Sequence, residues 1–462
     1  MNTQFALPSV PQRSGRLAVF ACAALAFTAP RTGHAQTGSR FGDGKSAEDT
    51  VTSVAAVFRR AHDTSPSARV SLASARIAVQ SASLAAAPLL PFISLEATAL
   101  RQTLNIATFG FPGPSAASDP FNVYTGGVRA QQTLIDPAAW RRVGAQRDSA
   151  RAAIGDDAAF RDVLGTGAAA RYYQLLAAEA SLTGRQADSL LASAVLNDAT
   201  DRRRVGDVTD IDVTRARLGV SAAAFGLTRS RAALSQARLD LALALGLPLA
   251  RLPVVRDSLR GPAPLDTATM TKLAGSGLDA TLTRRGDVLA SRFRARAASG
   301  LSSARRLELL PRVTAFGEFA ATGVATARLP AVYRTGVQVS MPLVDGFSRF
   351  RRAGINAEQE RIAAAVAEET ALRAAREVIG ASVELERAVS GLSVTEAQLE
   401  LALEELAQAR ARVRAGVGST LETTQGIAAV AAARDQVIAG RLDYHLARVE
   451  WHRATATLDA LR

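Results

Sequence analysis

The side chains best suited to metal or acid–base chemistry are few in this sequence. The histidines are His34, His62, His445 and His452, and Cys22 is the single cysteine. His445 and His452 stand seven residues apart, which places them on one face of a helix, but no cysteine or close carboxylate pair completes a metal site. The sequence also has no glycine-rich phosphate loop and no nucleophile motif. We therefore expect a protein that is not an enzyme and that uses no cofactor or metal.

Other polar side chains occupy every second position of four short segments. In 333–345, apolar Tyr333, Val337 and Val339 alternate with Arg334 and Gln338. Alternation of this kind predicts a strand with one apolar face and one face in contact with water. The same pattern recurs in 93–99, 123–135 and 313–324. The polar residues that we expect to line a water-filled lumen are Glu96, Arg129, Gln131, Glu318, Arg334 and Gln338.

Very long helices must hold these strands. Asp136 and Pro137 supply an N-cap and a first-turn proline, and no proline follows until Pro248. We predict a helix to about residue 204, a turn at Gly206, and a returning helix from Asp207 or Thr209 to about residue 245. The first of these helices is about 100 Å long at 1.5 Å per residue. A compact domain has no room for it.

The same order of elements appears twice. A helical region over 47–87, which breaks softly at 65–67, precedes the first strand pair, and a second helix begins at about residue 287. The separation from Asp136 to Gly206 is 206 − 136 = 70, and that from Asp345 to Gly416 is 416 − 345 = 71. A duplication with loop length as its main freedom explains this match. The predicted division is a leader over 1–35, a first structural repeat over 36–246, a connector over 247–286 and a second repeat over 287–462.

Apolar residues near the end of the second long helix indicate pairing of helices. Their spacing follows seven, four, three and seven residues, a heptad-like seam typical of a coiled coil. The residues are Leu392, Leu399, Leu403, Leu406 and Val413.

The first 35 residues have the pattern of a secretory signal. Arg13 and Arg16 precede an apolar run over 17–29, which is too short to span a bilayer, and small residues follow it. We expect Cys22 to leave with this leader. No other segment offers eighteen uninterrupted apolar residues. The basic residues that give the formal charge of +13 are interleaved with acidic residues along the helical segments. We therefore expect no nucleic acid partner.

Four two-faced strands cannot form a stable sheet in lipid by themselves. Backbone groups in a bilayer must be hydrogen-bonded, so a membrane sheet has to close, and membrane barrels need about eight strands or more. Three chains would supply about twelve strands with the apolar residues toward lipid. The competing interpretations are a soluble sheet with one buried face and a periplasmic coiled-coil scaffold or adaptor that forms no channel.

Three stretches resemble the TolC-like outer membrane efflux proteins, and the likeness follows the family's order over nearly the whole mature chain. They are the Leu-Leu-Pro sequences at 89–91 and 309–311, Gly-Val-Gln-Val-Ser-Met-Pro-Leu-Val-Asp-Gly at 336–346, and Arg-Ala-Gly-Val-Gly-Ser-Thr-Leu-Glu at 414–422.

The resemblance implies a mainly helical chain with a four-strand contribution. Three copies would share an outer-membrane β-barrel that continues as a periplasmic α-barrel. It implies an outer membrane channel of a tripartite efflux or type I secretion system, passive and dependent on its partners. Those partners are the homotrimer, a periplasmic adaptor, a proton-driven or ATP-driven inner-membrane transporter, and outer membrane lipid.

The resemblance also assigns residues to the helical tips. Gly206 and Gly416 mark the two turns, and the adaptor would contact Arg203, Gly206, Asp207, Gly416 and Ser419. Six residues past each glycine stand Asp212 and Glu422, which would lie at the periplasmic entrance with Gln425. The family usually has an aromatic residue where Arg203 and Val413 stand and a latch arginine where Gly418 stands, so we expect a weaker latch here.

Overall fold

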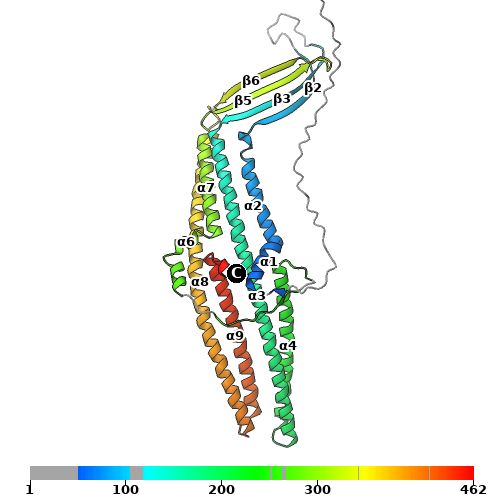
Figure 1. Ribbon diagram of the computed structural model, residues 1–462, viewed down its shortest axis with the longest axis vertical. Helices are drawn as coiled ribbons and strands as arrows, with labels where there is room; N and C mark the ends of the chain where they lie inside the picture. Colours follow the sequence, from blue (N-terminus) through cyan, green and yellow to red (C-terminus); the bar gives the residue numbers. More distant parts are fainter. Residues whose placement is uncertain are drawn as a thin grey trace, which may run out of the picture. The chain divides into compact units, whose positions relative to one another are not determined.

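The computed structural model describes residues 50–51, 53–104, 118–249, 252–262, 267–341, 343–415 and 417–461. Within the compact unit Glu48–Arg462, the chain consists mainly of helices, with one four-stranded sheet (Figure 1). This confirms the predicted fold class. The predicted leader and the tip residue Gly416 lie outside the described residues.

The elements follow one another in two similar series. The first series comprises α1 (Val54–Thr64), α2 (Pro66–Leu84), β2 (Phe92–Gln102), β3 (Phe121–Ile135), α3 (Pro137–Arg204) and α4 (Asp210–Ala244). The second comprises α7 (Gly286–Leu307), β5 (Arg312–Gly323), β6 (Ala331–Ser340), α8 (Ser348–Arg414) and α9 (Thr420–Ala454). The two long helices, α3 and α8, have 68 and 67 residues.

Local chemistry explains where the first long helix begins and ends. The carboxylate of Asp136 accepts a hydrogen bond from the Ala139 N–H at 2.8 Å, and Pro137 opens the helix. At the other end Gly206 has φ +81°, a conformation that favours glycine. The Gly206 and Asp207 N–H groups donate to the carbonyls of Arg203 and Arg202 at 3.1 and 2.9 Å. This pair of bonds closes the helix with a Schellman motif.

The start of the second long helix differs from the prediction. The two-faced strand ends at Ser340 rather than continuing to Asp345, and α8 begins at Ser348. Gly346 and Phe347 both have positive φ, 63° and 62°, so the chain turns sharply between strand and helix. Asp345 still bonds to this helix, because its carboxylate accepts from the Ser348 hydroxyl at 2.7 Å.

The four strands form an antiparallel sheet in the order β2-β3-β5-β6. Register pairs join Thr98 to Thr125, Thr125 to Thr322, and Glu318 to Arg334. The register shifts between Thr133 and Ile135, where β3 approaches α3. In Figure 1 the sheet lies at one end of α2, α3, α7 and α8.

The helices pack in two sets. Near the sheet, α3 lies beside α2 and α7, and α7 lies beside α8. Farther away, α3 pairs with α4 and α8 pairs with α9, so that each pair ends in a turn (Figure 1). We call these pairs the first hairpin (α3 and α4) and the second hairpin (α8 and α9).

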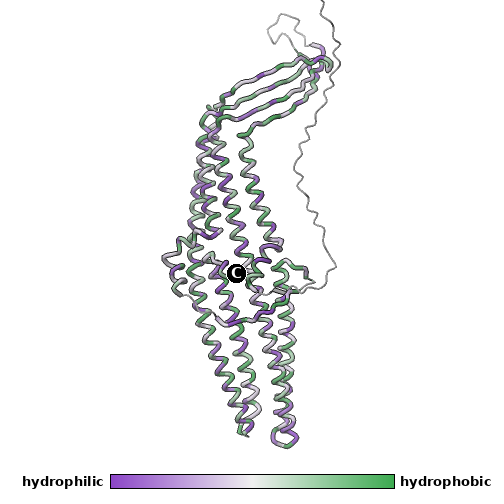
Figure 2. Tube along the Cα trace, viewed as in Figure 1, coloured by the Kyte–Doolittle hydropathy of each residue, from purple (hydrophilic) through white to green (hydrophobic). Residues whose placement is uncertain are grey.

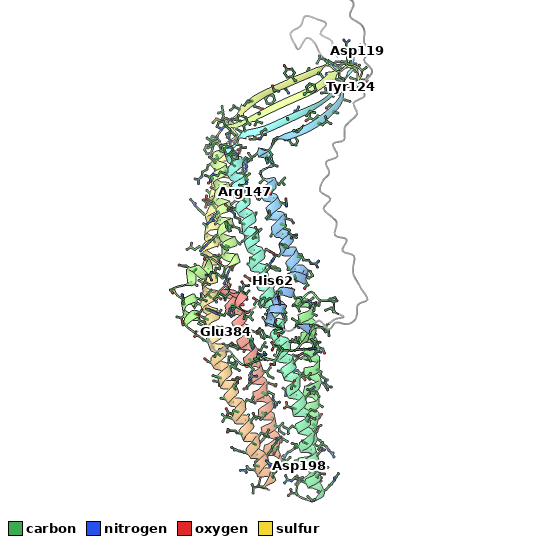
Figure 3. The ribbon with its side chains drawn as sticks, viewed as in Figure 1. His62, Asp119, Tyr124, Arg147, Asp198 and Glu384 are labelled. Carbon is green, nitrogen blue, oxygen red and sulfur yellow. The ribbon has the colours of Figure 1, made fainter. Side chains whose placement is uncertain are left out.

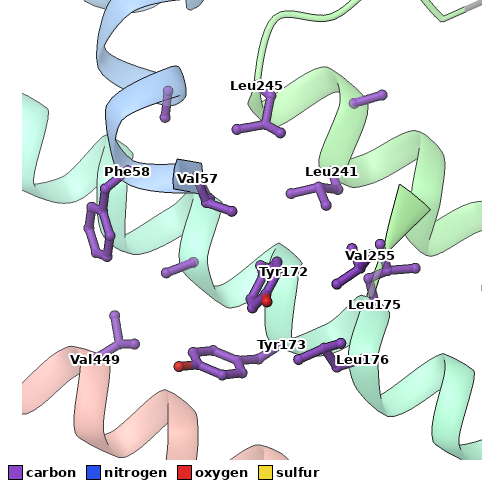
Figure 4. Packing of buried hydrophobic residues seen from close by; sticks show 14 of the residues in the cluster. Val57, Phe58, Tyr172, Tyr173, Leu175, Leu176, Leu241, Leu245, Val255 and Val449 are labelled. Atoms are coloured by element: carbon purple, nitrogen blue, oxygen red, sulfur yellow. The ribbon is translucent and has the colours of Figure 1, made fainter. Parts of the chain in front are cut away.

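The largest apolar cluster lies where α1, α3, α4 and α9 meet (Figure 4). Phe58 and Leu241 are fully buried in it, and Val449 is nearly so. The Tyr172 hydroxyl donates to the Asp257 carboxylate at 3.0 Å. Burial raises the pKa of Tyr172 well above its usual range, and the Asp257 charge adds to the effect. This cluster packs helices of both hairpins against one another and against α1.

The region between the two series contains short elements. Strand β4 (Val254–Val255) pairs in parallel with β1 (Thr50–Val51), and helices α5 (Thr267–Ala274) and α6 (Leu278–Leu282) contact α8. The short 3-10 helices η1 (Ala87–Leu89) and η3 (Leu458–Leu461) precede β2 and follow α9.

The predicted apolar seam on α8 needs one correction. Leu392 and Leu406 are buried and Leu399 is partly buried, as expected, but Leu403 is 48% exposed. The neighbouring Ala402 takes its place against α9, where small side chains allow close approach.

One helical segment, Pro66–Leu89, is long and apolar enough to cross a membrane by length and composition alone. Arg69 and Arg76 interrupt its apolar residues, so the sequence pattern alone does not indicate this segment. Ala68 and Ala75 are buried in this segment, which runs beside α3.

Candidate pore wall and helical tips

The sheet register places six polar residues on one face. Arg129 lies opposite Glu318, which lies opposite Arg334, and Gln338 lies opposite Thr314. Gln131 is two residues from Arg129, and Glu96 lies opposite Gly127. Because side chains two apart on a strand share a face, this set forms one surface, which we call the polar sheet face. Its members are Glu96, Arg129, Gln131, Glu318, Arg334 and Gln338.

The charges on the polar sheet face alternate across all four strands. Arg129 on β3 pairs with Glu96 on β2 at 3.3 Å and with Glu318 on β5 at 3.6 Å. Arg334 on β6 pairs with Glu318 at 2.7 Å. Cross-strand pairs of opposite charge stabilise a sheet. The row therefore keeps charged groups on this face while offsetting most of their charge.

Two aromatic residues interrupt the polar sheet face. Phe92 and Phe316 both lie opposite Gln131 on neighbouring strands. A Cβ at Gly336 would come within 3.0 Å of the Phe316 ring, so the ring lies across this glycine. The alternation of residues along single strands does not indicate this apolar patch, because it depends on the register between strands.

The opposite face of the sheet is apolar and uncovered in this chain. The side chains of Leu95, Phe319, Tyr333 and Val339 are 60% to 81% exposed. Figure 2 shows hydrophobic and hydrophilic residues alternating along the strands. An uncovered apolar surface of this extent is typical of a protein face that contacts lipid or another protein.

The first tip is held by ion pairs within its own hairpin. Arg203, at the end of α3, donates to the Asp210 carboxylate at 2.6 and 3.1 Å, and Arg202 pairs with Asp207 at 2.6 Å. This hydrogen-bonded contact lowers the pKa of Asp210 below its usual value. Asp198 lies close to this end in Figure 3. The arginine that stands where an aromatic was expected is therefore bonded to its own hairpin.

Asp212 and Glu422 occupy equivalent positions, each three residues after an N-cap. Asp212 accepts from the Thr209 N–H at 3.1 Å and from its hydroxyl at 2.6 Å, which completes a capping box. These bonds lower the pKa of Asp212. The Glu422 N–H donates to the Ser419 hydroxyl at 3.3 Å. Both acids thus contribute to the start of a helix, whatever else they do.

Side chains near Glu422 complete the second tip. Arg412 pairs with Glu422 at 3.2 Å, which joins α8 to α9. The Val417 and Gly418 N–H groups donate to the Arg412 carbonyl at 3.0 and 3.1 Å. Gln425 is exposed one turn farther along α9.

Two ion pairs join the first hairpin to the second, well away from the tips. Arg434 on α9 pairs with Asp188 on α3 at 2.7 Å and donates to the Gly184 carbonyl at 3.2 Å. Arg185 on α3 pairs with Asp435 on α9. We call these four charged residues the interhairpin clamp: Arg185, Asp188, Arg434 and Asp435.

His62 and His445 have structural contacts. His445 stacks on Tyr173 with ring centroids 4.3 Å apart, and burial lowers the pKa of His445. His62, beside α3, lies 3.0 Å from the Arg161 carbonyl through Nε2 (Figure 3). Within the described part of the chain, no group of three or more His, Cys, Asp or Glu residues could hold a metal ion.

Sequence reasoning missed the interhairpin clamp and the pairing within the charged row. The clamp joins residues about 250 apart in the chain, and no local pattern marks such a contact. The charged row left a signal, since Glu96, Arg129, Glu318 and Arg334 were each predicted to be polar strand residues, and their charges alternate in sign in that order.

Comparison with known proteins identifies related sequences. The model of the family "Outer membrane efflux protein" matches residues 277–457. The pyoverdine export outer membrane protein OpmQ of Pseudomonas aeruginosa is 26% identical over 403 residues, which cover 83% of this chain and 80% of that protein.

Solved structures share the fold. The outer membrane channel CmeC of Campylobacter jejuni has a TM-score of 0.76 and 14% identity, and the match covers 87% of this chain and 85% of that chain. The outer membrane protein VceC of Vibrio cholerae has a TM-score of 0.74 and 16% identity, with 87% and 95% covered.

Proposed function

Because this chain is a TolC-like outer membrane efflux protein, we propose that three copies form the outer membrane channel of a tripartite efflux or type I secretion system. The chain belongs to the outer membrane and extends into the periplasm, as its family does. Its family conducts solutes and is not enzymatic. The proposed channel is passive, and an inner-membrane transporter and a periplasmic adaptor supply the energy and the cargo.

The exposed state of the four-stranded sheet carries this proposal. Its apolar face is uncovered, and β2 and β6 are edge strands with no partner among the described residues. Lipid can cover the apolar face, but unpaired edge groups are costly there. Pairing β6 of one copy with β2 of the next, antiparallel like the other pairs, removes every edge. Three copies supply twelve strands, which is within the range of membrane barrels.

The polar sheet face then lines the water-filled pore. Glu96, Arg129 and Glu318 would face the lumen near one another, and Gln131, Arg334 and Gln338 would extend the same surface. This assignment is supported by their shared face and by the apolar character of the reverse face. In such a barrel the apolar face contacts lipid on the outside and the polar sheet face contacts water on the inside.

The tips would form the periplasmic entrance. We assign Asp212, Glu422 and Gln425 to this constriction, since the first two occupy equivalent helix starts beside the turns. A periplasmic adaptor would contact the turns themselves. The tip residues assigned to it are Arg203, Gly206, Asp207, Gly416 and Ser419.

The division into two repeats accompanies this proposal. We propose that 36–246 and 287–462 arose by duplication and that 247–286 connects them. The support is the recurrence of helix, strand pair and long helical hairpin on both sides of the short elements β4, α5 and α6.

Spin labels on adjacent residues of β6 test the channel. Gln338 lies on the polar sheet face and Val339 on the apolar face. In outer-membrane vesicles, a label at position 339 should be accessible to oxygen and a label at position 338 to a water-soluble nickel reagent. A water-exposed label at position 339 would refute the lipid assignment. Native mass spectrometry of the purified protein should give three copies, whereas a soluble monomer in the periplasmic fraction would favour the scaffold interpretation.

A further inference from the structure

A charged recess lies where the sheet joins the long helices. Its volume is about 350 Å³, within the range of small-molecule sites. Four arginines line it: Arg142 from α3, Arg312 from the start of β5, and Arg349 and Arg352 from the first turns of α8. We call this cavity the junction recess.

Three carboxylates also line the junction recess, and each is already bonded. Glu308 accepts from Arg142 at 2.9 Å and from Arg305 at 2.8 Å. Asp136 caps α3 and lies 3.5 Å from Arg142. These contacts occupy the acids on the α3 and α7 side.

The third carboxylate, Asp345, is bonded on the α8 side. It accepts from the Arg349 Nε at 2.8 Å and from the Ser348 hydroxyl at 2.7 Å. Among the described residues, no carboxylate lies within ion-pair distance of Arg312 or Arg352. The lining therefore holds one more arginine than carboxylate, and Arg312 and Arg352 are its two arginines that take part in no ion pair within the described part of the chain.

The strand residues that line the junction recess lie on the polar side of the sheet. Arg312 lies opposite Ser340, and both have the same parity as Glu318 and Gln338 on the polar sheet face. On α3, Trp140 is two residues from Arg142, so about 200° separates the two side chains around the helix. Trp140 is 53% exposed and faces away from the recess. An exposed tryptophan so close to the end of strand β3 is typical of an aromatic at a membrane interface.

We propose that the junction recess binds the carboxylate or phosphate groups of anionic solutes as they pass from the helical tunnel into the strand-lined pore. The inference rests on the proposed function, because the recess lies beside the path of the solute only if the chain forms the proposed channel. Guanidinium groups suit this role, since they bind planar carboxylates and phosphates through two parallel hydrogen bonds and stay charged. Arg142 and Arg349, already paired with Glu308 and Asp345, stabilise the junction between sheet and helices. Arg312 and Arg352 would contact the solute.

Binding of pyrophosphate tests the site without requiring a working channel. The probe is inorganic pyrophosphate, followed by ³¹P line broadening on the detergent-solubilised full-length protein. The wild type should broaden the signal, and the R312Q/R352Q protein should bind at least about tenfold more weakly because two charge-assisted contacts are lost. R351Q is the matched control, since Arg351 is an exposed neighbour on α8 that does not line the recess. R312K/R352K should bind with intermediate strength because it keeps the charge but loses the planar fork.

Several results would overturn the inference. They are equal broadening by wild type and R312Q/R352Q, an equal loss with R351Q, or binding of dihexanoyl phosphatidylglycerol in place of pyrophosphate, which would assign the recess to lipid headgroups.

Reversal potentials in a KCl gradient across planar bilayers form the second arm. R312Q/R352Q should lower the permeability to chloride relative to potassium, more so at 0.1 M than at 1 M salt, because salt screens exposed charges. A wild-type protein that binds pyrophosphate but forms no channel would refute the proposed function and leave the anion site standing.

Discussion

Replacing Arg434 with methionine should loosen the two hairpins from each other. The Arg434 guanidinium contacts Asp188 at 2.7 Å and the Gly184 carbonyl at 3.2 Å, and methionine keeps the aliphatic stem but removes both bonds. A hydrogen bond to a charged group contributes about 1.5–3 kcal/mol to stability. The side chains of Arg434 and Asp188 are 29% and 11% exposed, so partial screening favours the lower end. A loss of about 1.4 kcal/mol corresponds to a tenfold change in an equilibrium.

Single-channel recording in planar bilayers measures the effect. If separation of the hairpins opens the periplasmic end, Arg434→Met should raise the open probability of a mostly closed channel by about tenfold. Asp188→Asn should raise it less in the Arg434→Met background than alone, because the two residues share one contact. The control is Arg387→Met, whose partner Glu384 lies three residues away on the same exposed stretch of α8 (Figure 3).

Three outcomes would contradict this account of the interhairpin clamp. One is an open probability within about twofold of wild type after Arg434→Met, a change below roughly 0.5 kcal/mol. Another is an equal rise after Arg387→Met, which would indicate a general effect of lost surface charge. The third is additivity of the Asp188 and Arg434 substitutions, which would show that the contact is not energetically coupled.

Three further predictions concern packing, charge and pH. Gly165→Ala should destabilise the protein by about 1–3 kcal/mol in denaturant unfolding, because the new Cβ would come within 2.4 Å of the Phe58 ring. A Cβ at Gly167 would have nothing within 4 Å, so Gly167→Ala should be neutral or stabilising. Equal effects of the two substitutions would contradict the described packing. Glu422→Gln should reduce cation selectivity and cation block in bilayer recordings, and unchanged values would remove Glu422 from the entrance. Burial lowers the pKa of His452 to about 4, so its neutral form is favoured in the folded protein and stability should fall as pH drops from about 6.5 toward 4. His452→Gln should flatten that part of a melting-temperature profile against pH, and an unchanged slope would exclude His452 as its source.

Local patterns of residue type made most of the fold predictable. Alternation of polar and apolar residues located the strands, and Asp136 with Pro137 located the start of α3 to the residue. Gly206 marked the end of that helix because a left-handed residue is needed there. These features depend on residues close together in sequence.

Features that depend on distant residues were harder to predict. The strand at 333–345 was expected to reach Asp345, but β6 ends at Ser340, and α8 starts only after Gly346 and Phe347, which both have positive φ. Leu403 fitted the heptad spacing, yet the face of α8 that meets α9 passes through Ala402 instead.

The candidate site was predictable only in part. Polar strand residues were found from parity alone, but their ion pairs required the register of four strands. The junction recess draws its arginines from α3, β5 and α8, and no spacing within one segment indicates that they meet. Asp212 and Glu422 were assigned by resemblance, and the structure adds their hydrogen bonds at helix starts.

The apolar cluster at the centre of the chain has a consequence for how the protein folds. Its buried members run from Val57 near one end of the described chain to Leu458 near the other, and the β1–β4 pair joins Thr50 to Val254. Contacts between residues so far apart carry a large loop-closure cost and slow folding. The cluster is not complete until α9 supplies Val449, so synthesis must be nearly finished before the centre can form. Until then the exposed strands and half-formed core are open to aggregation and proteolysis, and the helix made last determines when that exposure ends.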